Sequence, residues 1–223
     1  MFANKQDPTK FYTAGEEIFN AVTHGVGSLF AIIGTSVLVT LACCHTTWHE
    51  VWICLVYGLS LIILYTMSTL YHAFPFPAVK KVFRIFDHTS IFLLIAGTYT
   101  PLMLIAMDGS AKGVTIFCVV WGAAILGVLA NAIALDKFEK LSLVLYVIMG
   151  WAVVFAIMDV VHALPLGALL FLVAGGVAYT GGILFYKSKR RYMHSVWHLF
   201  VLLGSVLHYI CIAVYVLPMA YIR

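Results

Sequence analysis

Charged side chains are scarce in this chain of 223 residues. Only 10% of the residues are Asp, Glu, Lys or Arg, whereas 63% are hydrophobic, and soluble domains carry about 25% charged residues. A soluble globule with this composition would present apolar surface to water and aggregate. The sequence therefore predicts a membrane protein with several spans. The net charge of +4 does not indicate a nucleic-acid partner, because its meaning depends on which loops hold the basic residues.

Signals for disulfides and for secretion are also lacking. The cysteines are scattered in or beside apolar runs, without metal-ligand spacing: Cys43, Cys44, Cys54, Cys118 and Cys211. This pattern favours small buried hydrophobic residues over a disulfide framework. Charged residues precede the first long apolar run: Lys5, Asp7, Lys10, Glu16 and Glu17. A cleavable signal peptide does not have this composition, so we expect the first span to remain in the mature protein.

Long apolar runs are what the chain does have. Seven of them reach the length of about 20 residues that a membrane helix needs. They cover 18–42, 51–72, 84–106, 113–134, 141–161, 165–186 and 195–217. The breaks between them are short, with turn residues or charges, and no internal repeat or linker is visible. The sequence predicts an all-α membrane protein, a single domain over 1–223 built as a bundle of seven transmembrane helices.

The basic residues predict how this bundle is oriented. Eleven of the 13 Lys and Arg residues lie in the N-terminal tail and in alternate connections, and only Lys112 and Arg223 lie on the other side. Lys and Arg favour cytoplasmic loops, so the N-terminus is expected in the cytoplasm and the C-terminus outside. This orientation is opposite to that of a G-protein-coupled receptor. The last run, 195–217, has no lysine for a retinal Schiff base.

A histidine pair begins the last run. His194 and His198 are four residues apart, so both rings lie on one face of a helix and could hold one metal ion. Taken alone, such a pair more often serves packing and hydrogen bonding. The predicted topology brings His72, at the end of the second run, and Asp87, at the start of the third, to the same depth. Ionisable groups inside spans are costly and usually functional.

Three imidazoles with an open fourth position are typical of a catalytic zinc site. Zinc lowers the pKa of a bound water to about 7, and Asp87 could take the proton of that water or orient it. Ser68, one turn before His72, could bond the water or a substrate oxygen.

Other polar residues fall at the same depth. Glu17, Asn20 and His24 form one stripe, which could support the site or form a hydrogen-bonded helix seam. Arg84 could anchor the helix at the cytoplasmic surface or face a substrate. His88 is next to Asp87 but about 100° away around the helix.

These residues also form motifs in a fixed order. The motifs are Glu17-x-x-Asn20-x-x-x-His24, Ser68-x-x-x-His72, Arg84-x-x-Asp87-His88, Gly97-Thr98-Tyr99-Thr100-Pro101 and His194-x-x-x-His198. Together they resemble the hemolysin III family, the bacterial branch of the progestin and adipoQ receptor family, which includes the adiponectin receptors. The resemblance covers essentially the whole chain.

The resemblance implies a seven-helix bundle in the bacterial inner membrane, with a cytoplasmic N-terminus. It implies zinc held near the inner surface by His72, His194 and His198, with Asp87 close by and Ser68 beside them. Glu17, Asn20, His24, Arg84, His88 and Tyr99 are then candidates for supporting the site or facing a substrate. Relatives in the wider superfamily include alkaline ceramidases, which suggests hydrolysis of a lipid amide.

Several functions fit these observations. The first is a zinc-dependent hydrolase of a lipid amide or ester near the cytoplasmic leaflet, which serves membrane-lipid homeostasis. The second is a membrane sensor or receptor-like regulator in which zinc only joins helices. A pore-forming haemolysin has little support, because seven long spans do not suit a soluble toxin. A transporter would need a polar pathway through the outer half. We expect membrane lipids, and no nucleic acid, as partners.

Overall fold

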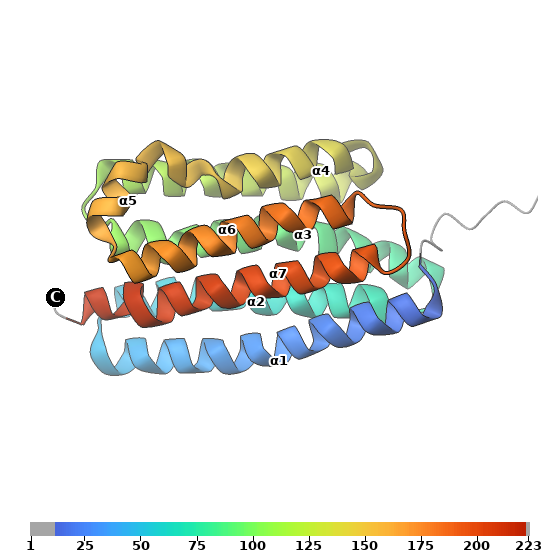
Figure 1. Cartoon of the computed structure of the whole chain (residues 1–223), viewed down its shortest axis with the longest axis horizontal. Helices are drawn as coiled ribbons and strands as arrows, with labels where there is room; N and C mark the ends of the chain where they lie inside the picture. The colour runs from blue at the N-terminus through green and yellow to red at the C-terminus, as the bar shows by residue number, and fades with distance from the viewer. Residues whose placement is uncertain (1–11, 222–223) are drawn as a thin grey trace, which may run out of the picture.

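A computed structural model describes residues 12–221, which form helices and connecting segments without a strand. The helices are α1 (Ala14–His45), α2 (Trp48–Ala73), α3 (Pro77–Pro101), η1 (Leu102–Ala106), α4 (Ala111–Gly150), η2 (Ala152–Ala156), α5 (Ile157–Ala163), α6 (Leu166–Tyr186), α7 (Met193–Ile210), η3 (Cys211–Val216) and η4 (Leu217–Ala220). They pack lengthwise into a bundle (Figure 1). The prediction of an all-α protein is confirmed.

Six helical stretches of the described chain are long and apolar enough to cross a membrane. They are Ala14–His45, Trp48–Ala73, Pro77–Ala106, Ala111–Ala163, Leu166–Tyr186 and Met193–Ala220. With the motifs that resemble a membrane family, they indicate a multi-pass membrane protein. The basic residues Lys5, Lys10 and Arg223, which enter the predicted orientation, lie outside the described residues.

The sequence predicted seven separate spans, and the difference lies in one segment. The predicted runs 113–134 and 141–161 fall within a single stretch of 53 residues. The expected loop at 136–140 is helical, and the backbone of α4 leaves helical geometry only at Ala134 (φ −155°, ψ 68°). No glycine or proline stands between Gly127 and Gly150. The chain is helical on both sides of Ala134.

Capping boxes explain why two helices begin earlier than predicted. Thr13 and Glu16 form one at the start of α1, and Thr47 and Glu50 form one at the start of α2. In each, the threonine side chain accepts from a backbone N–H while the glutamate side chain accepts from the N-cap N–H. The pattern Thr-x-x-Glu was visible in the sequence at both places.

Small residues bring the first three helices close together. A Cβ atom on Gly58 of α2 would lie 2.2 Å from Thr35 of α1, and one on Gly97 of α3 would lie 2.2 Å from Ser60 of α2. Such residues let helix backbones approach within a membrane. The seams fix α2 between its neighbours, and α2 carries His72 at its last turn.

The helix ends are arranged so that the candidate residues meet. The start of α1, the end of α2 and the starts of α3 and α7 lie at the same end of the bundle (Figure 1). This end is called the histidine end below. The opposite end contains η1, η3 and η4.

Candidate metal centre

Three histidines come together at the histidine end. His72, His194 and His198 each offer one ring nitrogen, and these three atoms lie within 4.8 Å of one another. Among the described residues this is the one group of three or more His, Cys, Asp or Glu side chains with metal-binding geometry. His72 comes from the end of α2 and the other two from the first turns of α7. The sequence predicted this convergence from helices that are far apart in the chain.

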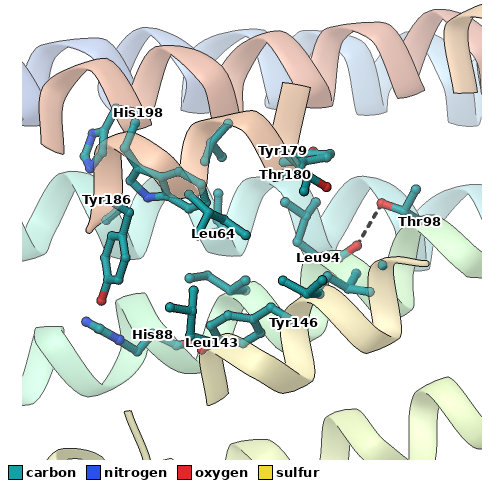
Figure 2. A pocket seen from close by; sticks show the side chains of 18 of the residues that line it. Leu64, His88, Leu94, Thr98, Leu143, Tyr146, Tyr179, Thr180, Tyr186 and His198 are labelled. Atoms are coloured by element: carbon teal, nitrogen blue, oxygen red, sulfur yellow. Dashed lines mark hydrogen bonds between the residues drawn. The ribbon is translucent and has the colours of Figure 1, made fainter. Parts of the chain in front are cut away.

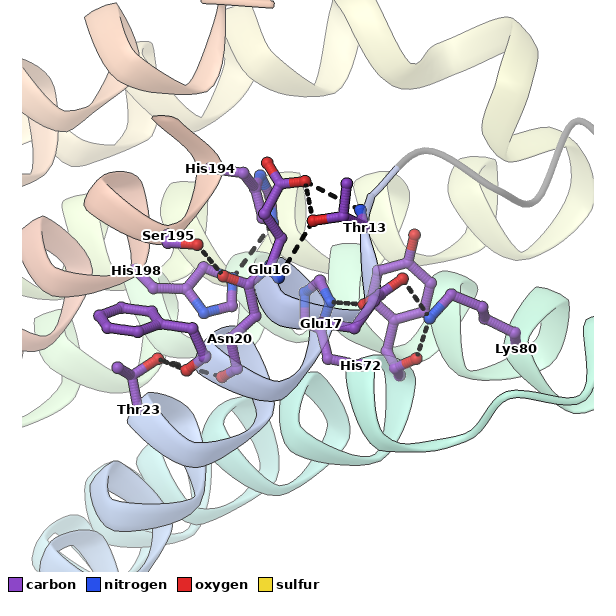
Figure 3. Close-up of polar contacts among 12 residues, drawn as sticks. Thr13, Glu16, Glu17, Asn20, Thr23, His72, Lys80, His194, Ser195 and His198 are labelled. Carbon is purple, nitrogen blue, oxygen red and sulfur yellow. Dashed lines mark hydrogen bonds and ion pairs between the residues drawn. The ribbon is translucent and has the colours of Figure 1, made fainter. Parts of the chain in front are cut away.

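His72 is oriented by a partly buried acid, Glu17. Its Nδ1 donates to Glu17 Oε2 at 2.6 Å, and Lys80 Nζ lies 2.8 Å from Glu17 Oε1 (Figure 3). Because Nδ1 carries the proton, Nε2 keeps its lone pair. That Nε2 atom is buried and has no hydrogen-bond partner in the described structure. A carboxylate bonded to one ring nitrogen while the other is free is the usual support of a metal-binding histidine.

The two histidines in the first turns of α7 face each other. His194 Nε2 and His198 Nε2 are 3.1 Å apart, so the two atoms either share a proton or meet at a cation. His24 of α1 stacks on His198, with ring centroids 3.6 Å apart and an interplanar angle of 12°. His24 is buried and neither of its ring nitrogens has a described partner. It lies against the cluster without being one of the three converging rings.

Two hydrogen bonds tie the start of α1 to the start of α7. Ser195 Oγ donates to Asn20 Oδ1 at 2.6 Å (Figure 3). The backbone N–H of Tyr192 donates to Glu16 Oε1 at 2.8 Å. Both links lie next to His194 in the sequence. The stripe of Glu17, Asn20 and His24 therefore touches a histidine or its neighbour at each of its three positions, and it is at the same time a seam between helices.

A cavity of about 140 Å³ opens from the cluster into the bundle. Its lining at the histidine end is polar: His24, Ser68, Asp87, His194 and His198. Beyond them the lining is mostly apolar and aromatic, with residues from α2, α3, α4, α6 and α7. Figure 2 shows His198, Tyr186 and His88 at one end, Leu64, Leu143 and Tyr146 farther along, and Thr98, Tyr179 and Thr180 at the other end.

Asp87 and Ser68 face this cavity with free polar groups. The carboxylate of Asp87 forms no hydrogen bond or ion pair within residues 12–221. The hydroxyl of Ser68 is buried, at 1% exposure, and it too has no described partner. Neither residue is one of the three converging ligands. Both are free to act on a molecule that enters the cavity.

Three predicted residues lie away from the three histidines. Arg84 bonds to Asp136 at 2.6 Å and to Glu139 at 2.9 Å, both on α4. The backbone carbonyl of His88 accepts from Tyr146, while its ring lines the cavity. The hydroxyl of Tyr99 donates to the carbonyl of Gly150 at 3.0 Å. Tyr99 is twelve residues beyond Asp87 on α3, about 18 Å along the helix, so it lines the far part of the cavity.

Sequence reasoning missed several residues around the cluster. Lys80 was counted only as a loop charge, yet it is 7% exposed and paired with Glu17. Glu139 lines the cavity and accepts from Tyr186 at 3.2 Å. The ring of Tyr12 stacks on His194 with centroids 4.7 Å apart. For these residues the sequence offered one signal, the capping box of Thr13 and Glu16. It marks the start of α1 and therefore the position of Tyr12 just before that helix.

The donor set fits a divalent transition metal. Imidazole nitrogens suit zinc, copper, iron and nickel, and three of them leave a tetrahedral ion one open position. The unpartnered Nε2 of His72 and the close approach of His194 and His198 both favour a cation between the rings. The cavity beside His194 and His198 leaves room for a further ligand of that ion.

Comparisons with known proteins identify the family of the chain. The family model described as Haemolysin-III related matches residues 12–209. Hemolysin-3 of Bacillus cereus is 42% identical over 206 residues, which is 92% of this chain and 94% of that protein. A Hemolysin-3 homolog of Bacillus subtilis (strain 168) is 34% identical over 205 residues, covering 92% and 96%.

A more distant relative comes from Homo sapiens. Monocyte to macrophage differentiation factor is 28% identical over 210 residues, covering 90% of this chain and 84% of that protein. This match fits the relationship to the progestin and adipoQ receptor family that the motifs predicted. The family model and the two Bacillus relatives together show that the chain belongs to the hemolysin III family of membrane proteins.

Proposed function

We propose that this protein binds zinc through His72, His194 and His198 and hydrolyses an amide or ester bond of a membrane lipid. One observation carries the proposal. The three converging nitrogens adjoin a cavity that is lined at their end by Ser68 and by Asp87, whose carboxylate has no hydrogen-bond partner among residues 12–221, and that is mostly apolar and aromatic beyond them. An apolar chain would lie along the far part of the cavity, with its carbonyl group among the polar residues.

Each residue then has a definite task. A bound zinc ion would supply Lewis acidity for a carbonyl oxygen and would acidify water. Asp87 takes a proton from the water whose oxygen adds to the carbonyl carbon. The hydroxyl of Ser68 donates to the carbonyl oxygen. When the C–N or C–O bond breaks, Asp87 returns the proton to the leaving nitrogen or oxygen. The products are a fatty acid and an amine or an alcohol.

The test is lipid hydrolysis by purified, zinc-loaded protein. We expect release of labelled fatty acid from at least one of ceramide, other N-acyl lipids and ester lipids, and loss of that release in Asp87→Asn. The matched control is Asp159→Asn, which removes a carboxylate that pairs with Lys112 far from the cavity. If the wild-type protein releases no fatty acid from any of these lipids with zinc bound, the hydrolase proposal fails.

We infer further that the stretch Ala111–Ala163 crosses the membrane twice, which gives seven crossings. Straight, 53 residues would form a helix about 80 Å long, against a hydrocarbon core of about 30 Å. Ser142 donates to Asn131 at 2.7 Å, although eleven residues of continuous helix would separate them by about 16 Å. Lys112 likewise meets Asp159 at 2.8 Å. These contacts support a reversal of the chain at Ala134.

Seven crossings with the distribution of Lys and Arg favour a cytoplasmic N-terminus and a histidine end that faces the cytoplasm. The Bacillus relatives support the plasma membrane of a bacterium as the location. Reporter fusions test the topology. We expect reporter fusions within 74–76 and within 187–191 to lie on the same side, in the cytoplasm, because α3, two crossings by Ala111–Ala163 and α6 separate them. Fusions at these two places on opposite sides of the membrane would contradict seven crossings.

A non-catalytic sensor is the second candidate. It is favoured by the links through which the centre joins α1, α2 and α7, such as Glu17 to His72 and Asn20 to Ser195. Zinc would then hold the helices in one arrangement that responds to the surrounding lipid. Under this alternative Asp87→Asn keeps the cellular phenotype of the wild type, whereas the hydrolase proposal requires its loss with zinc and folding retained.

A further inference from the structure

The ring of Tyr12 covers two of the three histidines. Its centroid lies 4.7 Å from that of His194 with the planes at 29°, and 5.7 Å from that of His72 with the planes at 59°. Tyr12 does not line the cavity, whereas His194 does. Burial raises the pKa of Tyr12, and the neighbouring Tyr71 and Tyr186 add to the shift.

The position of Tyr12 is fixed by the residues that follow it. Thr13 caps α1, and its N–H and hydroxyl both donate to Glu16 Oε2 at 2.8 Å. The other carboxylate oxygen of Glu16 accepts the N–H of Tyr192 at 2.8 Å. Glu16 thus connects the start of α1, and with it Tyr12, to the residue two positions before His194.

The partner residue in this connection is strained. Tyr192 has φ 61° and ψ 3°, the left-handed conformation, and in the described chain it is the only residue other than glycine with positive φ. Such a conformation is unfavourable for a residue other than glycine and persists where the surroundings hold it. Here the carboxylate of Glu16 accepts the N–H of Tyr192, and the next residue begins α7.

From this geometry we propose that Tyr12 is a positioning residue of the metal centre, which holds the ring of His194 by stacking and covers the rings of His72 and His194. The proposal rests on the metal centre proposed above and does not depend on hydrolysis. It predicts that bound metal would leave slowly, because the tyrosine ring would keep two of the residues that hold it in place. The Glu16–Tyr192 link keeps this cover in place.

The test is the rate at which full-length protein in detergent releases zinc to a colorimetric chelator. We expect release from Tyr12→Ala to be about tenfold faster, the change expected when an aromatic pair of ordinary strength is lost. Tyr12→Phe keeps the ring and should release zinc at the wild-type rate. The rate of zinc release from Glu16→Gln should lie between the rates of Tyr12→Ala and Tyr12→Phe. The matched control is Tyr221→Ala, because Tyr221 contacts His45 with centroids 4.8 Å apart at the opposite end.

Zinc content and circular dichroism are measured on every variant before the release assay. If Tyr12→Ala does not fold, Tyr12→Leu replaces it, since leucine keeps the bulk but not the stacking. Equal release from wild type and from the variant without the ring overturns the proposal, as does Tyr12→Phe behaving like Tyr12→Ala. Wild-type protein without bound zinc overturns it together with the metal centre. A protein that retains zinc but hydrolyses no lipid contradicts the hydrolase proposal and does not contradict the role of Tyr12.

Discussion

The two ends of the bundle are built differently. At the histidine end, five residues bury side-chain nitrogen or oxygen atoms that have no described partner: Asn20, His24, Ser68, His72 and His198. In η1, η3 and η4, at the opposite end, no described side chain has such an atom. That end is filled instead by apolar residues with 0–1% exposure: Met103, Ile105, Ile212, Val216 and Leu217.

This difference separates function from stability. A buried polar group without a partner costs about 1–3 kcal/mol, so a cluster of such groups is expected where a ligand will satisfy them. The packed end has no such cost. Even its irregular geometry has a local cause, since Pro101 lacks an N–H and the chain continues as the π-helix η1. The histidine end is therefore the end where we expect a ligand to bind, and the packing of the opposite end is expected to hold the bundle together.

The largest effect is expected from removing a ligand. His72→Ala should abolish metal binding, because the two remaining imidazoles cannot close the site. Elemental analysis should find about one zinc per chain in the wild type and none in the variant. His208→Ala is the matched control, since His208 bonds to the carbonyl of Leu172 away from the cluster. Full zinc content in His72→Ala would show that the metal lies elsewhere.

Removing a buried side chain at the opposite end should lower stability and leave the zinc content unchanged. Ile212 is fully buried in η3, and Ile212→Ala should lower the free energy of unfolding by about 2–5 kcal/mol through the lost packing. Thermal unfolding in detergent measures this change, with zinc content determined on the same sample. We expect zinc to be retained. A variant that loses zinc but unfolds like the wild type would abolish the contrast between the two ends.

A smaller effect is expected from neutralising Glu17, whose carboxylate bonds to Nδ1 of His72. Glu17→Gln should weaken zinc binding about 10- to 100-fold, the usual range for such supporting groups, because the amide still accepts from Nδ1 but brings no charge. Competition with a chelator of known affinity measures the change. Glu50→Gln is the control, since Glu50 caps α2 at the other end of that helix. An unchanged affinity in Glu17→Gln would mean that His72 needs no such support.

The smallest effect is expected from the exposed ion pair at the opposite end. Lys112→Ala removes a partner of Asp159 at 2.8 Å, and both side chains are largely exposed, at 64% and 40%. Such pairs contribute little to stability. Neither the unfolding temperature nor the zinc content should change measurably. A clear drop in unfolding temperature would show that the apolar packing does not account for the stability of that end.

Much of the fold and of the site could be predicted from the sequence. Hydropathy identifies the helices because apolar runs of this length have few other uses. The spacing of His194 and His198, together with loop charges, brought His72 to the same place. The break at the single residue Ala134, with helix directly on both sides, could not be predicted, because the charges at 136–140 resemble a loop and no proline or glycine marks the turn.

The sequence also did not allow us to predict which basic residues near the helix ends are buried. Lys80 looks like any other basic residue at a helix end, and only the approach of α1 gives it Glu17 as a partner. The same holds for Tyr12, whose place over His194 depends on the connection between Glu16 and Tyr192. Contacts between distant segments determine these positions, and local patterns do not contain them.

X-ray absorption at the zinc edge of the purified wild-type protein tests the central claim most directly. A centre formed by His72, His194 and His198 predicts three imidazole nitrogens at about 2.0–2.1 Å and one further light ligand. Sulfur in the coordination shell, fewer than three imidazoles, or protein purified without any bound metal would contradict it.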